Sequence, residues 1–328
     1  MRGSERQGRV PIRDSCTGGS MYTGRDIAKV LELIAPLESG VPGDELGFIF
    51  GDPDQQVTGV GCTWCAHARS IQLCADQGLN MIICHEGIRM PEQRSPWYDG
   101  PKTAEEIFSN RVQSELLTKH KMVVYRSHSN WDALPGNGVA DQAVAALQIE
   151  GLKTVARQKF FSVQELPRPM TVRELKSHVD RGLDYTSCRI FGDSTKLVRR
   201  FSFLIGGFGE NQFHMPQAAR DMGAEALIIG EMSEFIVIAA LEMGIPVIET
   251  LHSVSEIPAI KRQAELLGHH LPDLPVHYIP SGAVTFDSNR SIEDKRVPLG
   301  QTTDTADRTQ ELPPLIRVLP PDEMNSER

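Results

Sequence analysis

The segment MIICHE, residues 81–86, leads a short apolar run directly into a histidine and a carboxylate. Two further apolar runs, at residues 122–125 and 246–248, are also followed by a histidine and an acid. The six polar residues are His85, Glu86, His128, Asp132, His252 and Glu256. Short apolar runs are typical of buried strands, and side chains at strand ends meet where sites assemble in α/β domains. This context is compatible with one shared site for the six side chains, whereas a packed or surface histidine is the default interpretation of each pair.

Around these segments, short apolar runs alternate with helix-like segments, which predicts an α/β fold. Residues 23–37 have the apolar spacing of an amphipathic helix, and Thr171 with Glu174 forms a capping-box pattern at the start of another helix. We place the boundary between a first α/β half, residues 23–155, and a second, residues 156–286, near residue 155.

The two ends of the chain read differently from the part between them. Residues 1–22 are polar, and residues 287–328 are charged and contain several prolines. Such segments bury too little apolar surface to fold alone. We expect a flexible leader and a disordered tail.

Composition excludes several classes of protein. The net charge is −9 and no run of Lys or Arg is present, which argues against binding to nucleic acid phosphates. No window approaches the roughly 20 apolar residues of a membrane span, and the N-terminus lacks the apolar region of a secretory signal. Six cysteines are too few for a disulfide framework in a chain of 328 residues. We expect a soluble, cytoplasmic protein.

Spacing alone is a weak signal for a metal site. His269 and Asp273 have the same i, i+4 spacing as two of the pairs, yet they fall beside Pro272 and follow no apolar run. Without context, a packed or surface histidine is the default interpretation. The strand-end context of the other pairs favours a shared site, because imidazole and carboxylate are the usual ligands of catalytic zinc, manganese or iron.

Four segments, at residues 80–86, 124–132, 223–231 and 249–256, resemble in order the signature blocks of the Nif-three-like family (Ngg-one interacting factor three, also labelled GTP cyclohydrolase type two). The resemblance spans most of residues 25–282. It implies two α/β halves with mixed sheets, a dinuclear metal site between them, and a homo-oligomer, often a hexameric ring. Family members commonly have two adjacent histidines in the first block, so Glu86 follows the less common pattern.

The resemblance also implies a metal-binding role for the six residues and a function. Two divalent ions per chain (zinc, manganese or iron) would be held by His85, Glu86, His128, Asp132, His252 and Glu256. Three carboxylates and three neutral imidazoles leave such a centre about one unit positive, which suits an anionic substrate. The implied activity is a metal-dependent hydrolase, GTP cyclohydrolase-like and acting on a purine nucleotide, with a phosphoester as the substitute small-molecule substrate. The alternative is a non-catalytic, metal-binding oligomeric regulator or metal-handling protein.

Three other features of the sequence each have a functional and a purely structural interpretation. Glu231, in the third block, is either a catalytic base or outer carboxylate, or an acid favoured by a helix N-terminus. Cys62 and Cys65 have zinc-ribbon or redox spacing but no second pair, which favours packing. The glycine-rich residues 205–210 could wrap a phosphate or form a tight turn.

Overall fold

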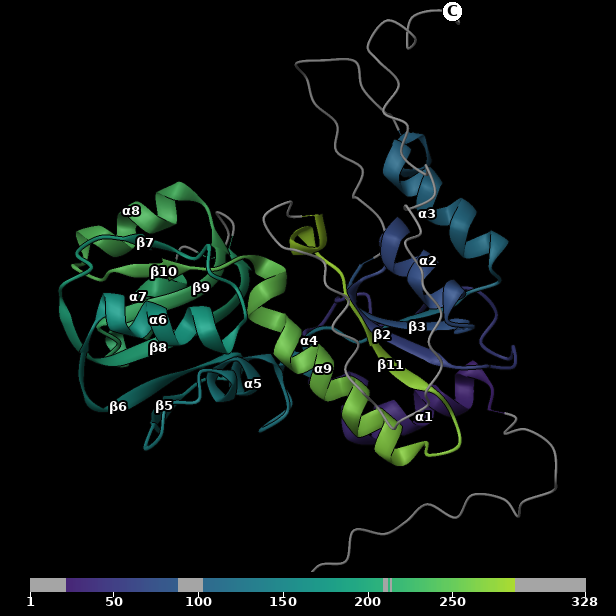
Figure 1. Cartoon of the computed structure of the whole chain (residues 1–328), viewed down its shortest axis with the longest axis horizontal. Coiled ribbons are helices and arrows are strands. Elements are labelled where there is room, and N and C mark those ends of the chain that lie inside the picture. Colours follow the sequence, from purple (N-terminus) through teal and green to yellow (C-terminus); the bar gives the residue numbers. More distant parts are fainter. Residues whose placement is uncertain (1–21, 88–102, 209–211, 213, 287–328) are drawn as a thin grey trace, which may run out of the picture. The chain divides into compact units, whose positions relative to one another are not determined.

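The computed structural model describes residues 22–87, 103–208, 212 and 214–286, all within one compact unit, Met1–Arg290. Apart from Tyr22, the predicted leader lies outside the described residues, and so does the predicted tail. Two mixed β-sheets with flanking helices confirm the α/β prediction (Figure 1).

The first sheet has five strands, and the carboxyl ends of its parallel strands lie at the same edge of the sheet. Its order is β1 (Gly47–Phe50), β4 (Val123–Arg126), β3 (Met81–Glu86), β2 (Val60–Cys65) and β11 (Val276–Ile279). The strand β1 is antiparallel to β4, and the other neighbours are parallel. The apolar residues of β3 are completely buried, which accounts for the continuous apolar run in the sequence.

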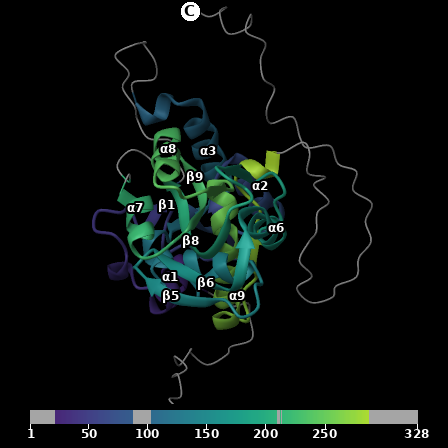
Figure 2. The same cartoon turned by 90° about the vertical axis from the view of Figure 1, so that its left-hand side faces the viewer.

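The second sheet has six strands. Figure 2 shows its neighbouring strands β6, β8 and β9. Its order is β5 (Lys153–Arg157), β6 (Phe161–Thr171), β8 (Leu197–Phe208), β9 (Ala226–Met232), β10 (Val247–Glu249) and β7 (Arg189–Phe191). Only the neighbours β8, β9 and β10 run parallel in this sheet. Their carboxyl ends therefore lie at one edge.

The helices of the described chain include α1 (Gly24–Ile34), α2 (Ala68–Asp76), α3 (Phe108–Lys119), α4 (Ser129–Asp132), α5 (Val139–Ala146), α6 (Val172–Gly182), α7 (His214–Asp221), α8 (Glu234–Glu242) and α9 (His252–His270). Short 3₁₀ turns cover Leu37–Ser39, Ala104–Glu106 and Ala283–Phe286. None of these described helices is long and apolar enough to cross a membrane.

Local sequence signals fix the helix starts that the sequence predicts. The Thr171 hydroxyl accepts from the Glu174 backbone N–H, and the Glu174 carboxylate accepts from the Thr171 N–H, so the predicted capping box at α6 is confirmed. The amphipathic helix predicted from residue 23 is α1, which buries Ile27 and Leu31 and has its own capping box at Thr23.

The longest described helix, α9, connects the two sheets. It packs against β2 and β11 of the first sheet and against β8 and β9 of the second (Figure 1). Because α9 begins directly after β10, its first turns lie at the carboxyl edge of the second sheet. This position allows one helix to bring side chains to both sheets.

The observed elements differ from the predicted ones at several places. The strand β5 was not predicted, because its residues are mostly exposed and form no apolar run. The strand β11 was assigned to the second half, yet it pairs with β2 of the first sheet after α9 has crossed between the sheets. The sequence also predicts a final helix over residues 256–267, whereas the observed helix α9 is longer and begins at His252.

Candidate metal centre

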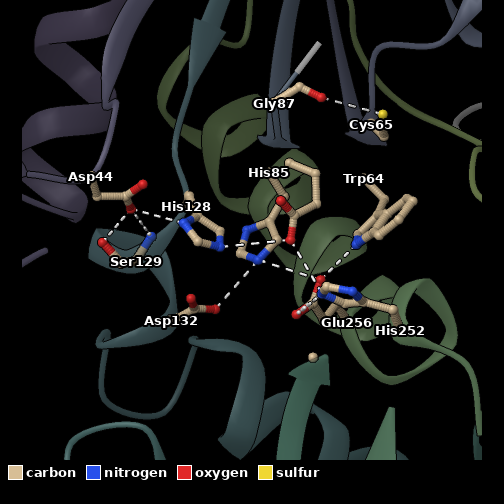
Figure 3. A network of polar contacts seen from close by, with 12 residues as sticks. Asp44, Trp64, Cys65, His85, Gly87, His128, Ser129, Asp132, His252 and Glu256 are labelled. Carbon is tan, nitrogen blue, oxygen red and sulfur yellow. Dashed lines mark hydrogen bonds and ion pairs between the residues drawn. The ribbon is translucent and has the colours of Figure 1, made fainter. Parts of the chain in front are cut away.

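The six predicted ligands converge in one cluster at the carboxyl ends of strands from both sheets. Figure 3 shows His85, His128, Asp132, His252 and Glu256 of this cluster. The residues are supplied as pairs: His85 and Glu86 end β3, His128 and Asp132 bracket the short helix α4 after β4, and His252 and Glu256 lie in the first turns of α9 after β10. Parallel strands place their carboxyl ends at one edge, which explains why pairs so far apart in the sequence meet.

The three imidazoles present the same atom, Nε2, to the carboxylates. Nε2 of His85 lies 3.4 Å from Oδ1 of Asp132 and 3.5 Å from Oε2 of Glu256. Nε2 of His252 lies 3.3 Å from Oε1 of Glu256. These separations are longer than ordinary hydrogen bonds, so the groups face a common centre without closing on one another.

Glu86 lies between the two halves of the cluster. Its Oε1 is 3.2 Å from Nε2 of His252 and 3.6 Å from Nε2 of His128. Two groups of potential ligands result, His85–Glu86–His128 and Glu86–His252–Glu256, and the donor atoms within each group lie within 4.8 Å of one another. A carboxylate shared by both groups is suited to bridge two ions. Asp132 belongs to neither group and adds a carboxylate beside His85.

The opposite ring nitrogen of each histidine is held by a separate partner. Nδ1 of His85 donates to the backbone carbonyl of Ser127 over 3.2 Å, and Nδ1 of His128 donates to Oδ2 of Asp44 over 2.8 Å. Nδ1 of His252 donates to Oε1 of Glu231 over 3.1 Å. Such bonds fix the ring orientation and the tautomer, leaving Nε2 as the ligand atom.

Two buried polar atoms in the cluster have no hydrogen-bond partner among the described residues: Nε2 of His85 and Oδ1 of Asp132. Leaving buried polar atoms unsatisfied costs about 1–3 kcal/mol each, so native proteins rarely do so without a ligand or function. Imidazole and carboxylate donors of this kind fit a divalent metal ion. The residues present therefore fit the metal group that the sequence resemblance implies.

The cluster has a buried floor and an accessible face. The side chains of His85, Glu256 and Asp132 are 0%, 3% and 10% exposed. Those of Glu86 and His252 are each 24% exposed, and that of His128 is 26% exposed. Among the described ligand candidates, these three side chains form the more accessible side of the cluster.

The charges of the cluster call for a cation. Burial lowers the pKa of His85, but Asp132 and Glu256 outweigh it and raise that pKa to about 9. Burial also opposes charge on His252, but the carboxylates of Glu231, Glu256 and Glu86 outweigh burial and raise the pKa of His252 to about 12. Without an ion, the carboxylates thus favour the protonated, positively charged forms of His85 and His252. A divalent ion would supply that positive charge in place of the two protons.

Glu231 lies in β9 and contacts the cluster through His252. Its side chain is 58% exposed, and the hydrogen bond from His252 lowers its pKa. It is therefore a charged carboxylate on the accessible face. It belongs to the strand and not to the first turn of α8, which begins at Glu234, so the helix-dipole interpretation does not account for it.

The segment Cys62–Cys65 contributes its tryptophan to the site. Trp64 donates from Nε1 to Oε2 of Glu256 over 2.5 Å, and its ring lies 5.3 Å from that of His252 in an edge-on arrangement. Both thiols are neutral packing groups, because burial raises the pKa of Cys65 to about 12 and that of Cys62 further. This agrees with the packing interpretation of the cysteines.

The glycines at the end of β8 allow the backbone to pass beside the ligands. A Cβ atom on Gly206, which has a φ of 72°, would lie 2.8 Å from Oε1 of Glu256. A Cβ on Gly207 would lie 2.7 Å from Oε1 of Glu231 and 2.9 Å from Nδ1 of His252. The glycine-rich segment is thus required for close approach to the cluster. Its residues 209 and 210 lie outside the described part of the chain.

The six candidate residues lie close together in the structure, whereas sequence reasoning missed the residues that hold them. Asp44 and the carbonyl of Ser127 lie in loops whose sequence has no recognisable motif. Arg126 donates to Asp44 over 2.5 Å, but in the sequence it is only the last residue of a strand. Trp64 had a signal, its place in the Cys62–Cys65 segment at a strand end. His269 is exposed at the far end of α9 and belongs to no group of potential ligands among the described residues.

Fold and cluster together define an α/β protein with a histidine–carboxylate site suited to divalent metal ions. The chain belongs to the Duf34/NIF3 (NGG1p interacting factor 3) family, whose model matches residues 22–283. The family predicted from the four sequence segments is thereby confirmed.

Curated relatives and solved structures agree with this assignment. The GTP cyclohydrolase 1 type 2 homolog of Clostridium perfringens is 25% identical over 262 residues, which cover 78% of this chain and 95% of the relative. The Streptomyces coelicolor protein of the same name is 25% identical over 268 residues, which cover 77% of this chain and 89% of the relative.

Among solved structures, the Bacillus cereus protein related to NIF3 has a TM-score of 0.66 at 16% identity, and the match covers 80% of this chain and 97% of the Bacillus chain. Reduced HcgD from Methanocaldococcus jannaschii has a TM-score of 0.62 at 17% identity and covers 80% of this chain and 100% of its own. At such identities the solved structures show a shared fold alone.

Proposed function

We propose that the protein is a dinuclear metal-dependent hydrolase acting on a purine nucleotide. The observation that carries the proposal is the convergence of three Nε2 atoms and three carboxylates, with Glu86 in both groups of potential ligands. The groups His85–Glu86–His128 and Glu86–His252–Glu256 would each hold one ion, with Asp132 beside His85. Zinc, manganese and iron suit this donor set.

Bound divalent ions supply Lewis acidity and activate water near neutral pH. The protein's own groups position the ligands and handle the proton. Asp44 and Glu231 orient His128 and His252 through their Nδ1 atoms. Because Glu231 is charged and exposed on the accessible face, it is the group we assign as general base.

The substrate class comes from the relatives' names. Several relatives are named GTP cyclohydrolase 1 type 2 homolog, a name that refers to GTP, a purine nucleotide. We infer that a purine nucleotide is the substrate here too, with a phosphoester as the substitute. A metal cluster near one unit of positive charge suits either anion.

The test combines metal analysis with turnover. Purified protein is expected to hold about two divalent ions per chain and to hydrolyse a member of a nucleotide and phosphoester panel. His252→Ala should abolish turnover, because it removes a ligand of one group and the partner of Glu231. His269→Ala is the matched control, since this exposed histidine lies on the same helix. Its ion content and turnover should equal those of the unmodified protein.

Each other outcome contradicts part of the proposal. A folded protein that takes up no divalent ion contradicts the site. Two ions without turnover across the panel contradict the hydrolase and favour the non-catalytic, metal-binding regulator or metal-handling protein.

We also propose that the chain forms a homo-oligomer, a hexameric ring by family resemblance. The supporting observation is an apolar stripe on α8, where Phe235, Ile238 and Leu241 are 67%, 46% and 36% exposed. Apolar side chains three residues apart share one helix face, and clustered exposure of this kind marks interaction surfaces. Light scattering should show an oligomer that Phe235→Glu dissociates, whereas Leu33→Glu, at an equally exposed site on α1, should not. A monomeric unmodified protein contradicts this proposal.

A further inference from the structure

A cavity of about 520 Å³ opens beside the metal centre, at the carboxyl ends of β8, β9 and β10. One side is formed by His252 and Glu231, which belong to the centre or contact it directly. Met232 and Leu251 supply apolar surface, Arg189 and Glu249 supply charged groups, and Gly207 and Ser233 complete the lining. This volume falls within the range of about 300–1,000 Å³ that small-molecule sites occupy.

The cavity lies where the metal centre is accessible. Its lining includes His252, which belongs to the exposed face, and excludes the buried floor of His85 and Asp132. Open α/β sheets bind their ligands outside the carboxyl ends of parallel strands, which is the edge that this cavity occupies. A molecule in the cavity therefore meets the centre on its accessible side.

Arg189 is the cationic group among the lining residues, and two contacts fix its position. Its Nη2 donates to the carboxylate of Glu249, whose side chain is only 8% exposed. The guanidinium carbon also lies 5.3 Å from the centre of the Phe191 ring. No other hydrogen-bond partner of this guanidinium is found in the described part of the chain, and the Arg189 side chain is 68% exposed.

An arginine held in this way is a receptor for oxyanions. The guanidinium has five N–H donors in a rigid plane that matches phosphate oxygens, and one donor is occupied by Glu249. Because the ion pair and the ring contact fix the plane in advance, little entropy is lost when a ligand binds. The apolar Met232 and Leu251 lie along the same cavity and can contact a planar ring.

We propose that this cavity is the substrate pocket and that Arg189 holds the phosphate group of a nucleotide whose base reaches the metal centre at His252. This assignment rests on the proposed function for the identity of the nucleotide. It adds a residue that selects the nucleotide over the nucleoside. It also gives the substrate an orientation, with the phosphate at Arg189 and the base toward Glu231 and His252.

The test measures binding, not turnover, on the full-length, metal-loaded chain. Calorimetric titrations with GMP and with guanosine give the preference for the phosphate group. The unmodified protein is expected to prefer GMP by about 10-fold or more, the usual value of charged hydrogen bonds. Arg189→Gln should reduce this preference to about 2-fold with unchanged ion content, and Arg189→Lys should retain part of it.

Arg25→Gln is the matched control, because Arg25 is also exposed and paired with a carboxylate, that of Asp54, on the distant helix α1. Its preference for GMP should equal that of the unmodified protein. A preference that persists in Arg189→Gln overturns the proposal and places the phosphate on the metal ions or elsewhere. Absence of binding by both ligands overturns it too.

Failure of the pocket and failure of the hydrolase give different results. Loss of the GMP preference in Arg189→Gln without turnover on any nucleotide supports the pocket and contradicts the hydrolase. Turnover combined with an unchanged preference in Arg189→Gln supports the hydrolase and contradicts the role of Arg189.

Discussion

Removal of the Asp44 carboxylate is expected to weaken the metal centre without altering any of the six ligands. Asp44 accepts from Nδ1 of His128 over 2.8 Å, from Oγ of Ser129 over 2.6 Å and from Nη1 of Arg126 over 2.5 Å. Burial opposes its charge, but the bonds from Ser129, His128 and Arg126 outweigh burial and lower the pKa of Asp44. Asp44→Ala therefore removes a charged carboxylate that accepts hydrogen bonds from three side chains.

The magnitude follows from what Asp44→Ala leaves behind. Arg126 is 10% exposed and would keep only the carbonyl of Glu45, at 2.9 Å, and the Glu86 carboxylate, at 3.7 Å. Breaking a buried ion pair costs about 3–5 kcal/mol, and the nearby Glu86 reduces this to about 2–4 kcal/mol of unfolding free energy. Losing the group that orients a metal-binding histidine lowers metal affinity about 10- to 100-fold.

Urea unfolding measures the first quantity, and competition with a chromogenic chelator measures the second. Asp54→Ala is the control, because Asp54 also pairs with an arginine, Arg25, but is 66% exposed. Its unfolding free energy should change far less than that of Asp44→Ala, because a surface ion pair contributes little to stability. Equal losses in Asp44→Ala and Asp54→Ala, or unchanged metal affinity in Asp44→Ala, would refute the reasoning.

Three shorter predictions concern the same centre. Gly206→Ala and the control Gly244→Ala should each lose about 1–2 kcal/mol of unfolding free energy to left-handed strain, since their φ angles are 72° and 76°. Only Gly206→Ala should lose metal affinity as well, because its methyl group meets Glu256, whereas the methyl group of Gly244→Ala meets nothing within 4 Å. Equal metal affinity of the two variants would contradict this expectation. Trp64→Phe keeps a ring beside His252 but removes the hydrogen bond to Glu256, so chelator competition should show about 10-fold weaker metal binding, and no change would exclude a positioning role. Divalent metal at 100 times its Kd should raise the unfolding free energy by about 2.7 kcal/mol relative to chelator-treated protein, and identical urea curves would contradict a native-state metal site.

Local signals in the sequence predicted much of the fold. The residues MIIC of β3 form a strand because all four are buried in a parallel part of the sheet, and a continuous apolar run is the signature of that environment. The capping box of α6 is equally local, since Thr171 and Glu174 satisfy each other's backbone groups. Such elements depend on few residues outside themselves, so the sequence alone predicts them.

The groups that hold the ligands could not be predicted in the same way. Asp44 lies in a loop 84 positions before His128, and its role depends on the loop lying beside α4. The bond from His85 uses a backbone carbonyl, that of Ser127, which every residue type possesses. For Trp64, the only signal in the sequence is its position between Cys62 and Cys65. Long-range packing determines these contacts, and packing leaves no short-range pattern.

The two histidine–acid pairs at the ends of α9 show what spacing lacks. His252/Glu256 and His269/Asp273 have the same separation in the sequence, yet only the first pair lies at a sheet edge. The first turn of α9 follows β10 and is connected to β8 by the Ser255 hydroxyl, which accepts from the N–H of Gly206 over 3.3 Å. His269 and Asp273, at and just beyond the other end of α9, are both exposed to solvent. Strand topology therefore distinguishes a ligand pair from a chance pair.

The same geometry explains why Glu86 is the residue that joins the two groups of potential ligands. As the last residue of β3, it lies where the first sheet ends, and its Oε1 faces both His128 from the first half and His252 from the second. A carboxylate has two oxygens and can bridge two ions, whereas an imidazole at this position would offer one ligand atom at a time. In the proposed two-ion centre, Glu86 would therefore be the carboxylate that belongs to both groups of potential ligands.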